Sequence, residues 1–600
     1  MDLTRRTVVK SAIATFAASA GAHSAARQET SSSTEGQQFF ARLLKSSNQT
    51  VARMLEQTSS VPQARAGRGV GRGSTVAALA AAYCAPESSF FQSAALIPLL
   101  ESATKMFVDA QNKDGTLDAG NLASPPDTAF VVEGLATALA VLRRANDRQL
   151  AQAEQNLTKF LLAAGEALVT GGVHTPNHRW VICSGLARIN SLFPAAKYVN
   201  RIDDWLGEGI YIDSDGQFEE RSAGIYSRVT VNALVTMSRL LDRPALLDPV
   251  RRNLDMNLYY LHPDGEVETI GSRRQDQTMA ISISNYYLQY RYLAIHENNP
   301  AYAAVVRSIE SKPGEGLVEG SNPVIYFLEE PLLKKSLPEG GAIPDSYSRI
   351  FSNSRLARIR RGNISATVYG GSDWPLGVAS GLASNPTFFT FRNGGAVLQS
   401  VRMGGEFFGE GAFRSDNLEA GKNGYILHQK LDVPYYQPLP RHFRNAHGDY
   451  PLTPAKDFRF WSKLDFPHRP MGNIQTLDQR VTIIEDSGRF ELHFDISGHD
   501  RVPFLVELAF RTEGELTGTL QEVTTRDGDK VLLLKEGNLR YRAGNDIIEI
   551  GPGQAEHQML NLSGPSYAAH GATLRAAGKR VYITGFTPFQ KTIMIRGIQA

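Results

Sequence analysis

The seven residues HTPNHRW, at positions 174–180, bring amide, imidazole and guanidinium side chains close together. Such groups can hydrogen-bond and neutralise a carboxylate on which negative charge develops during a reaction. A structural alternative makes Asn177 the N-cap of a following helix and Trp180 a core anchor. That alternative leaves His178 and Arg179 without a role, so the segment is a candidate for chemistry.

A second segment, at 211–237, reads YIDSDGQFEERSAGIYSRVTVNALVTM and places Tyr226 behind an acidic loop, at the start of a predicted helix. A tyrosine hydroxyl can transfer a proton to or from a substrate as a general acid or base. The alternative is an amphipathic residue at the rim of a core.

Other polar side chains lie in the predicted connections between helices. Those that can line a groove are Asn121, Asp127, Glu219, Arg273 and Arg274. Asp127 has the alternative of capping a helix after a Pro-Pro pair. The two arginines have the alternative of being solvated surface charge.

Neither a CxxC nor an HExxH pattern occurs, so the sequence predicts no metal site and no cofactor. The two cysteines, Cys84 and Cys183, stand in apolar, helix-like surroundings. We predict two buried free thiols, although a disulfide is possible in an exported protein.

The N-terminus is predicted to be a targeting segment. Residues 1–26 carry a twin-arginine pair, Arg5 and Arg6, followed by an apolar run at 11–22 that is too short to span a bilayer. We therefore expect a signal peptide and export to the periplasm or the medium, against the alternative of a basic amphipathic helix. The polar stretch at 27–36 is predicted to be a disordered spacer.

Composition limits the remaining classes. A chain of 600 residues is too long for one core, and its net charge of +2 gives no reason to expect a nucleic acid as partner. After the leader no run of 18 apolar residues occurs, so we expect no association with a membrane once the signal is cleaved.

The periodicity of apolar residues divides the chain into an α part and a β part. From 37 to 310 it is helical, with hairpins at irregular intervals, which indicates a solenoid or a closed α/α toroid. Residues 311–348 are rich in Gly, Pro and Glu and are predicted to be a linker. From 349 to 600 short strands alternate with turns, which predicts an antiparallel β-sandwich.

The pieces NHRW and DGQFEERSAGIYSRVTVNAL, in this order and spacing, resemble the polysaccharide lyases of the heparinase II/III and alginate lyase superfamily. Those enzymes join an incomplete α/α toroid to an antiparallel β-sandwich. The resemblance implies metal-independent β-elimination on an acidic polysaccharide, with Tyr226 as acid and base. It also implies that Asn177 and His178 neutralise the uronate carboxylate. The β half departs from the heparinase pattern, because it lacks an HxH cluster for the structural zinc of some members.

The resemblance also implies residues that bind substrate. Arg179 and Trp180 would do so from the α half, and such lyases often add a histidine or tyrosine from the sandwich. The candidates in the β half are His428, Tyr436, His442 and His447, in an apparent loop that is rich in aromatic and imidazole groups. Ordinary aromatic packing is the alternative for each of them.

Two other functions stay open at this point. A glycoside hydrolase on an α/α toroid needs two carboxylates about 5–10 Å apart. The side chains that can supply them are Asp127, Asp215, Glu219 and Glu220. A non-catalytic carbohydrate-binding protein is the third class. The sequence names neither the glycan nor an endo or exo mode of action.

Overall fold

The structure is a computed structural model of the 600-residue chain. It describes residues 18–56, 73–312, 323–373, 382–421, 424–458, 460–525, 528–560 and 577–599, without the side chains of residues 18–35 and 278.

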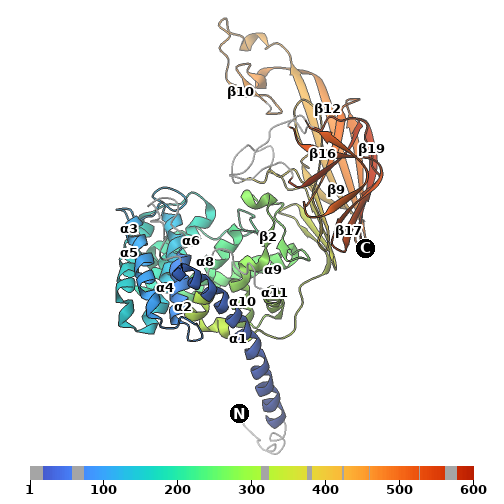
Figure 1. Cartoon of the computed structure of the whole chain (residues 1–600). Helices are drawn as coiled ribbons and strands as arrows, with labels where there is room; N and C mark the ends of the chain where they lie inside the picture. Colours follow the sequence, from blue (N-terminus) through green and yellow to red (C-terminus); the bar gives the residue numbers. More distant parts are fainter. Residues whose placement is uncertain are drawn as a thin grey trace, which may run out of the picture. The chain divides into compact units, whose positions relative to one another are not determined.

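Helices occupy the first half of the described chain (Figure 1). They are α1 (Ala18–Glu56), α2 (Ser74–Cys84), α3 (Ile97–Ala110), α4 (Pro125–Ala145), α5 (Ala151–Thr170), α6 (Pro176–Leu192), α7 (Ala196–Leu206), α8 (Tyr226–Leu240), α9 (Leu247–Tyr260), α10 (Tyr287–His296), α11 (Pro300–Glu310) and α12 (Pro323–Glu329). Short 3₁₀ helices join several of them, among them η5 (Gln275–Thr278).

Strands occupy the second half, after two short strands β1 (Glu266–Val267) and β2 (Ile281–Ser282). They are β3 (Ser346–Phe351), β4 (Leu356–Arg361), β5 (Ile364–Tyr369), β6 (Phe389–Asn393), β7 (Ala396–Gly405), β8 (Asn417–Gly421), β9 (Gly424–Tyr436), β10 (Thr453–Pro454), β11 (Trp461–Ser462), β12 (Met471–Asp486), β13 (Arg489–Gly498), β14 (Pro503–Phe510), β15 (Glu515–Thr524), β16 (Lys530–Ala543), β17 (Asp546–Gly551), β18 (Lys579–Phe586) and β19 (Phe589–Gln599). The predicted order of an α part followed by a β part is confirmed.

The chain forms two compact units, and their borders do not follow the change from helix to strand. The helical unit consists of Met1–Gly209, Val229–Leu247 and Ser284–Ile343, and the β unit contains all the rest. The β unit thus includes Ile210–Arg228 and Asp248–Ile283 from the first half of the chain. Periodicity in the sequence does not predict this exchange.

The helical unit is an incomplete α/α toroid whose core helix is α4. This helix packs against α2, α5, α6 and α12. By length and composition it is the one described helix that could cross a membrane, but 67% of its apolar window is buried inside the unit. Its hydrophobicity is therefore explained by its place in the core.

The structure describes only part of the N-terminal segment for which the sequence makes predictions. Residues 1–17 lie outside the described residues, and α1 begins at Ala18 within the predicted leader. The helix continues through 27–36, the stretch predicted to be a spacer. From Phe39 onward α1 buries apolar side chains. Cys84 and Cys183 are both free, as predicted, but only Cys183 is buried, whereas Cys84 is half-buried.

A buried ion network joins helices α4, α6, α8 and α12 within the helical unit. Arg188 of α6 forms two 2.7 Å hydrogen bonds with the carboxylate of Glu133 on α4. The carboxylate of Glu329 on α12 lies 3.5 Å from Arg188 and 2.7 Å from Arg239 on α8. Glu330 adds a 3.0 Å pair to Arg239. One carboxylate on α12 therefore holds α6 and α8 together.

We expect Glu329→Gln to lower the free energy of unfolding by about 3 kcal/mol, because it leaves the buried guanidinium of Arg188 and the partly buried guanidinium of Arg239 short of a counter-charge. Burial opposes the ionisation of Glu329, but Arg188 and Arg239 outweigh it and lower the pKa of this carboxyl. A lowered folded pKa means that the stabilisation is complete above the ordinary glutamate pKa and is lost as the pH falls through the folded value. Urea unfolding from pH 7 to pH 3 measures both effects. Glu166→Gln breaks an exposed ion pair and should change stability little. An equal loss of stability in both variants contradicts the prediction.

The β unit is a sandwich made by one long, curled sheet. Its strand order is β3-β4-β5-β6-β7-β14-β18-β16-β17-β19-β13-β12-β9-β8, with β15 on β16, and among the described strands only the β16–β18 pair is parallel. Phe389 on β6 and Phe490 on β13 have ring centroids 5.3 Å apart, although these strands are not neighbours in the sheet. The sheet therefore closes over a shared apolar core, as the alternating pattern predicts.

Two segments differ from the prediction. The linker at 311–348 contains helix α12, whose residues Val324, Ile325 and Phe327 are buried. The aromatic and histidine-rich stretch after 423 begins as the 13-residue strand β9, and only its part after Tyr436 lacks strand structure. In both cases glycines and prolines near the apolar residues hid an element that tertiary packing stabilises.

Candidate active site

Tyr226 stands at the first position of α8 with its ring partly exposed. The Ser222 Oγ accepts a 3.0 Å hydrogen bond from the backbone N–H of Tyr226. The Gln275 Nε2 donates a 2.6 Å hydrogen bond to the tyrosine hydroxyl. The guanidinium of Arg274 lies 4.1 Å from the ring centroid. Because Gln275 is the donor, the hydroxyl proton of Tyr226 can point to a substrate.

A buried carboxylate fixes the loop that carries these partners. Asp276, on η5, is fully buried and accepts a 2.8 Å hydrogen bond from Ser222 and another from Ser272. Burial raises the pKa of Asp276, and the two serine hydrogen bonds offset only part of this effect. The loop before Tyr226 and the 3₁₀ helix that carries Gln275 are thereby tied together. Gln275 was not among the residues predicted from the sequence, although it stands next to the predicted arginine pair.

Arg273 and Arg274 both have structural partners. Arg274 forms an ion pair with Glu220, which is 7% exposed. Arg273 forms a bidentate pair with Asp373, at 2.9 and 3.1 Å. Its NH1 donates to the carbonyl of Glu219, whose side chain is exposed. The alternative of two solvated surface charges is therefore wrong.

The acidic loop before Tyr226 is a tight turn. Asp213 Oδ1 accepts hydrogen bonds from the backbone N–H groups of Asp215 at 3.0 Å and Gln217 at 2.9 Å. Gly216 has a φ of +91°, and a Cβ there would lie 2.5 Å from a backbone oxygen of α9. Asp215 Oδ2 accepts the N–H of Ser354 at 3.0 Å. The carboxylates of Asp213 and Asp215 thus build the loop.

Asn177 and His178 lie in the first turn of α6 in the helical unit. They are 1% and 7% exposed. Both side chains are therefore buried more deeply than the predicted role of lining a groove requires. Thr175 is the N-cap, which makes the N-cap alternative for Asn177 wrong. Asn177 Nδ2 donates a 3.3 Å hydrogen bond to Thr175 Oγ1. The His178 ring lies edge-on to His174 at 4.6 Å and to Phe130 at 6.3 Å.

The next two residues of α6 have structural contacts. Trp180 is 3% exposed, as the core-anchor alternative requires. The guanidinium of Arg179 lies 4.9 Å from the tryptophan ring and forms a 2.8 Å ion pair with Glu208. A role of Arg179 in binding substrate would have to compete with this partly exposed pair.

Asn121 and Asp127 lie together at the N-terminus of α4. Ser124 is the N-cap, and its Oγ accepts from the N–H of Asp127 at 3.2 Å. Asp127 is therefore in the first turn and is not itself the cap. Its Oδ2 accepts from both the backbone and the side-chain nitrogen of Asn121, at 3.1 and 2.8 Å.

His428 and Tyr436 lie in strand β9. A ring nitrogen of His428 is 2.9 Å from Asp478 on the neighbouring strand β12. The Tyr436 ring is 4.6 Å from that of Phe466. These contacts explain the positions of both side chains within the β unit. A role of either residue in the site stays a prediction.

His442 and His447 follow β9 in an exposed segment. The His442 ring is 4.2 Å from that of Phe443, and the backbone N–H of His447 donates to Asn445 at 3.0 Å. None of the contacts described for these two histidines involves Tyr226. Their participation in the site stays a prediction as well.

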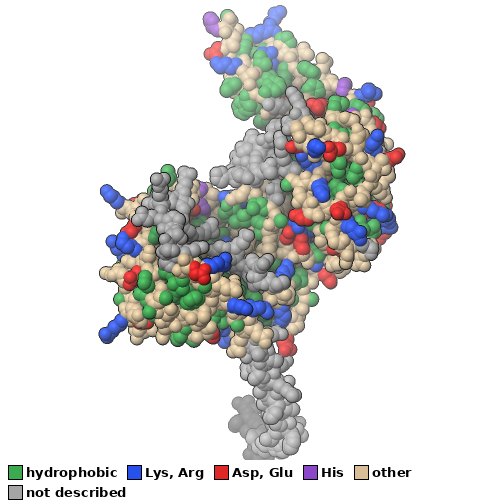
Figure 2. Space-filling model, viewed as in Figure 1, with side chains coloured by type: hydrophobic (Ala, Val, Ile, Leu, Met, Phe, Trp, Pro, Cys, Tyr) green, Lys and Arg blue, Asp and Glu red, His purple; other side chains and the backbone are tan. Residues whose placement is uncertain are grey.

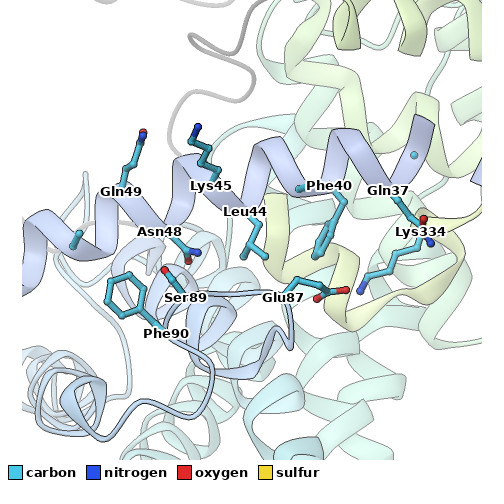
Figure 3. A pocket seen from close by; sticks show the side chains of 13 residues that line it. Gln37, Phe40, Leu44, Lys45, Asn48, Gln49, Glu87, Ser89, Phe90 and Lys334 are labelled. Atoms are coloured by element: carbon cyan, nitrogen blue, oxygen red, sulfur yellow. The ribbon is translucent and has the colours of Figure 1, made fainter. Parts of the chain in front are cut away.

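The helical unit also contains a large cavity. It has a volume of about 840 Å³ and is lined by Phe40 and Leu44 of α1, by Phe90 and by Lys334 (Figure 3). None of the residues predicted from the sequence lines it. Within the described ranges, no group of three or more His, Cys, Asp or Glu side chains could hold a metal ion.

On the face seen in Figure 2, acidic and basic side chains are interspersed.

Comparisons with known proteins give similarity of structure only. No family model and no curated protein sequence matches the chain. Heparinase III superposes with a TM-score of 0.52 at 11% identity, over 88% of this chain and 76% of that chain. A Paenibacillus xanthan lyase superposes with a TM-score of 0.52 at 10% identity, over 88% of this chain and 53% of that chain. This chain has the polysaccharide lyase fold. The likeness confirms the predicted architecture of toroid and sandwich.

Proposed function

We propose that the protein is a polysaccharide lyase that cleaves a uronic-acid-containing glycan by β-elimination without a metal. The observation that carries the proposal is the setting of Tyr226. Its hydroxyl accepts from Gln275, and a guanidinium lies over its ring. The polysaccharide lyase fold supports the same reaction class, although fold alone does not establish activity.

In the proposed reaction, Tyr226 in its deprotonated form removes the proton from C5 of the uronate. The electrons of the C5–H bond form the C4–C5 double bond as the bond from C4 to the leaving oxygen breaks. Tyr226 then returns the proton to that oxygen, so one residue serves as base and acid. Charge that develops on the uronate carboxylate is met by hydrogen bonds from Asn177 and His178, with Arg179 as a further clamp.

The alternative of a glycoside hydrolase is not favoured. It needs one carboxylic acid and one carboxylate that are both open to substrate. Glu220 is buried and paired with Arg274, and Asp215 accepts a backbone hydrogen bond. Glu219 is exposed, whereas the carboxylate of Asp127 accepts two hydrogen bonds from Asn121.

The decisive experiment is an ultraviolet assay of the purified protein on a panel of uronate polysaccharides, with and without a chelator. The panel contains alginate, glucuronan, heparan sulfate, chondroitin and xanthan. Elimination produces an unsaturated uronate that absorbs in the ultraviolet, and the signal should survive the chelator. Release of saturated sugars alone would establish hydrolysis, and binding without turnover would leave a carbohydrate-binding protein.

We expect Gln275→Leu to lower kcat by roughly two- to tenfold, the size of one neutral hydrogen bond. The substitution removes the donor to the Tyr226 hydroxyl and keeps a similar volume. The KM should change little if Gln275 acts on the tyrosine and not on the substrate. An unchanged kcat means that the 2.6 Å bond does not orient the hydroxyl.

We also propose that the protein is exported, because a polysaccharide substrate lies outside the cell and residues 1–26 carry the features of a twin-arginine leader. N-terminal sequencing of the protein from the periplasm or the medium should find a chain that starts near residue 23 or 27. Replacing Arg5 and Arg6 together by lysine should keep the protein in the cytoplasm.

A further inference from the structure

A second polar cavity lies within the β unit, on the outer face of strands β6 and β7. Alternation along these strands puts one set of side chains into the apolar core and the other set onto the opposite face. The side chains on that opposite face are Thr390, Arg392, Ser400 and Arg402. In an ordinary sandwich such residues meet water. Here they are covered.

The rest of the lining comes mainly from the segment that contains β1 and η5. Glu268, Thr269, Gln277 and Met279 of this segment line the cavity together with the strands, and so does Arg511, just after β14. The cavity has a volume of about 200 Å³. One water molecule takes about 30 Å³, and drug-sized ligands need about 300–1,000 Å³. The space therefore suits a small ion or a single sugar and not a chain.

Three guanidinium groups line this space. Arg392 pairs with Asp264 at 2.7 Å and with Glu266 at 2.8 Å. Arg511 also pairs with Glu266. Arg402 is 4% exposed, and its Nε donates a 3.0 Å hydrogen bond to Thr387. The two acids that balance Arg392 and Arg511 do not themselves line the cavity, so its wall is rich in cationic N–H donors.

Glu268, the one carboxylate in the lining, is already compensated. Its Oε1 accepts the backbone N–H groups of Thr269 and Ile270, both at 2.9 Å. Its Oε2 accepts from Thr367 and lies 3.4 Å from Arg358. Burial opposes the ionisation of Glu268, but His262, Arg358 and Thr367 outweigh it and lower the pKa of this carboxyl, so the group is ionised and bound within the protein.

A buried hydroxyl in the same wall lacks a hydrogen-bond partner. Ser400 is 4% exposed, and within the described chain its Oγ has no donor or acceptor in reach. A buried polar group of this kind costs free energy unless something in the cavity bonds to it. The hydroxyl and the guanidinium groups together match the oxygens of an anion.

We propose that this cavity is a binding site for one small oxyanion, of the carboxylate or sulfate class, held by Arg402, Arg392 and the hydroxyl of Ser400. The anion is either a free inorganic ion or the acidic group of a single sugar. Both present oxygen acceptors to guanidinium and hydroxyl donors, and both fit the volume. The site does not depend on the proposed lyase reaction.

Equilibrium dialysis of the full chain against radiolabelled sulfate, at constant ionic strength in chloride, tests the site. We expect saturable binding of about one sulfate per chain. Ser400→Ala and Arg402→Gln should each weaken the binding about tenfold or more, the size of a hydrogen bond to a charged group. Arg542→Gln is the control. It removes the same charge at an exposed arginine of the same unit and should leave the binding unchanged.

The variants and competitors separate the outcomes. Ser400→Ala keeps the test valid if Arg402→Gln fails to fold, because the serine hydroxyl has no partner to lose within the described residues. If glucuronate displaces the labelled sulfate at a lower concentration than unlabelled sulfate does, the ligand is the acidic group of a sugar. If only unlabelled sulfate displaces it, the ligand is a free ion. Absence of saturable binding overturns the proposal. Binding that is equal in all variants, or competition by neutral glucose, overturns it as well.

Discussion

Replacing Tyr226 by phenylalanine is expected to lower the rate of elimination about 100-fold or more, the range of positioned proton transfer. The change removes the hydroxyl that accepts from Gln275 and keeps the ring under the guanidinium of Arg274. Stability should fall by no more than about 1 kcal/mol, the net value of one hydrogen bond. The measurement is the initial rate of ultraviolet absorbance on the substrate found in the panel, together with the thermal midpoint.

The β unit offers a matched control in Tyr259. The guanidinium of Arg349 lies 4.1 Å from the ring centroid of this tyrosine, as that of Arg274 does from Tyr226. Tyr259→Phe therefore repeats the chemical change at a site without a proposed role, and its activity should match that of the wild type. If Tyr226→Phe still forms the unsaturated product at the normal rate, Tyr226 is a packing residue and another base must be sought.

The second large effect is expected from Asn177→Ala. Loss of one preorganised donor to the developing charge should reduce kcat about 100- to 1,000-fold. Because Asn177 is 1% exposed and its amide donates to Thr175, we also expect a loss of stability of about 1 kcal/mol. Assays well below the thermal midpoint separate the catalytic effect from the structural one. His178→Ala should behave in the same way.

Asn156→Ala is the control for this prediction. The Asn156 amide donates to the hydroxyl of Thr104 at 3.1 Å, a bond like that of Asn177 to Thr175. The control should lose stability without losing activity. If the two asparagine variants retain equal activity, the role of Asn177 in neutralising the carboxylate is contradicted.

Much of the fold follows from periodicity. Residues 349–600 are predicted to form short strands, and β13 at Arg489–Gly498 follows this pattern because its residues alternate strictly and Gly ends the run. Helix α12 was missed because its seven residues lie in a stretch rich in Gly, Pro and Glu. Its apolar side chains become buried only through packing against α1, α2 and α4. Single-segment patterns do not carry that information.

The site was predictable by residue type and less so by environment. The sequence indicated Tyr226 and the arginine pair. It could not show that Arg274 lies over the tyrosine ring or that Gln275 reaches its hydroxyl, because these residues are about fifty positions apart. It also could not show that Asn177 is buried behind a threonine cap. Spacing indicates which groups are present, and tertiary contacts decide what each group touches.

The carboxylate of Glu329 has a consequence for mutational scans of this protein. It bonds Arg239 on α8 and lies 3.5 Å from Arg188 on α6. These helices begin with the residues proposed for catalysis. A scan that records activity alone would rank Glu329 with the catalytic residues, although it touches no substrate in the proposed reaction. Scoring the same library for abundance at two temperatures would separate this false positive from Tyr226.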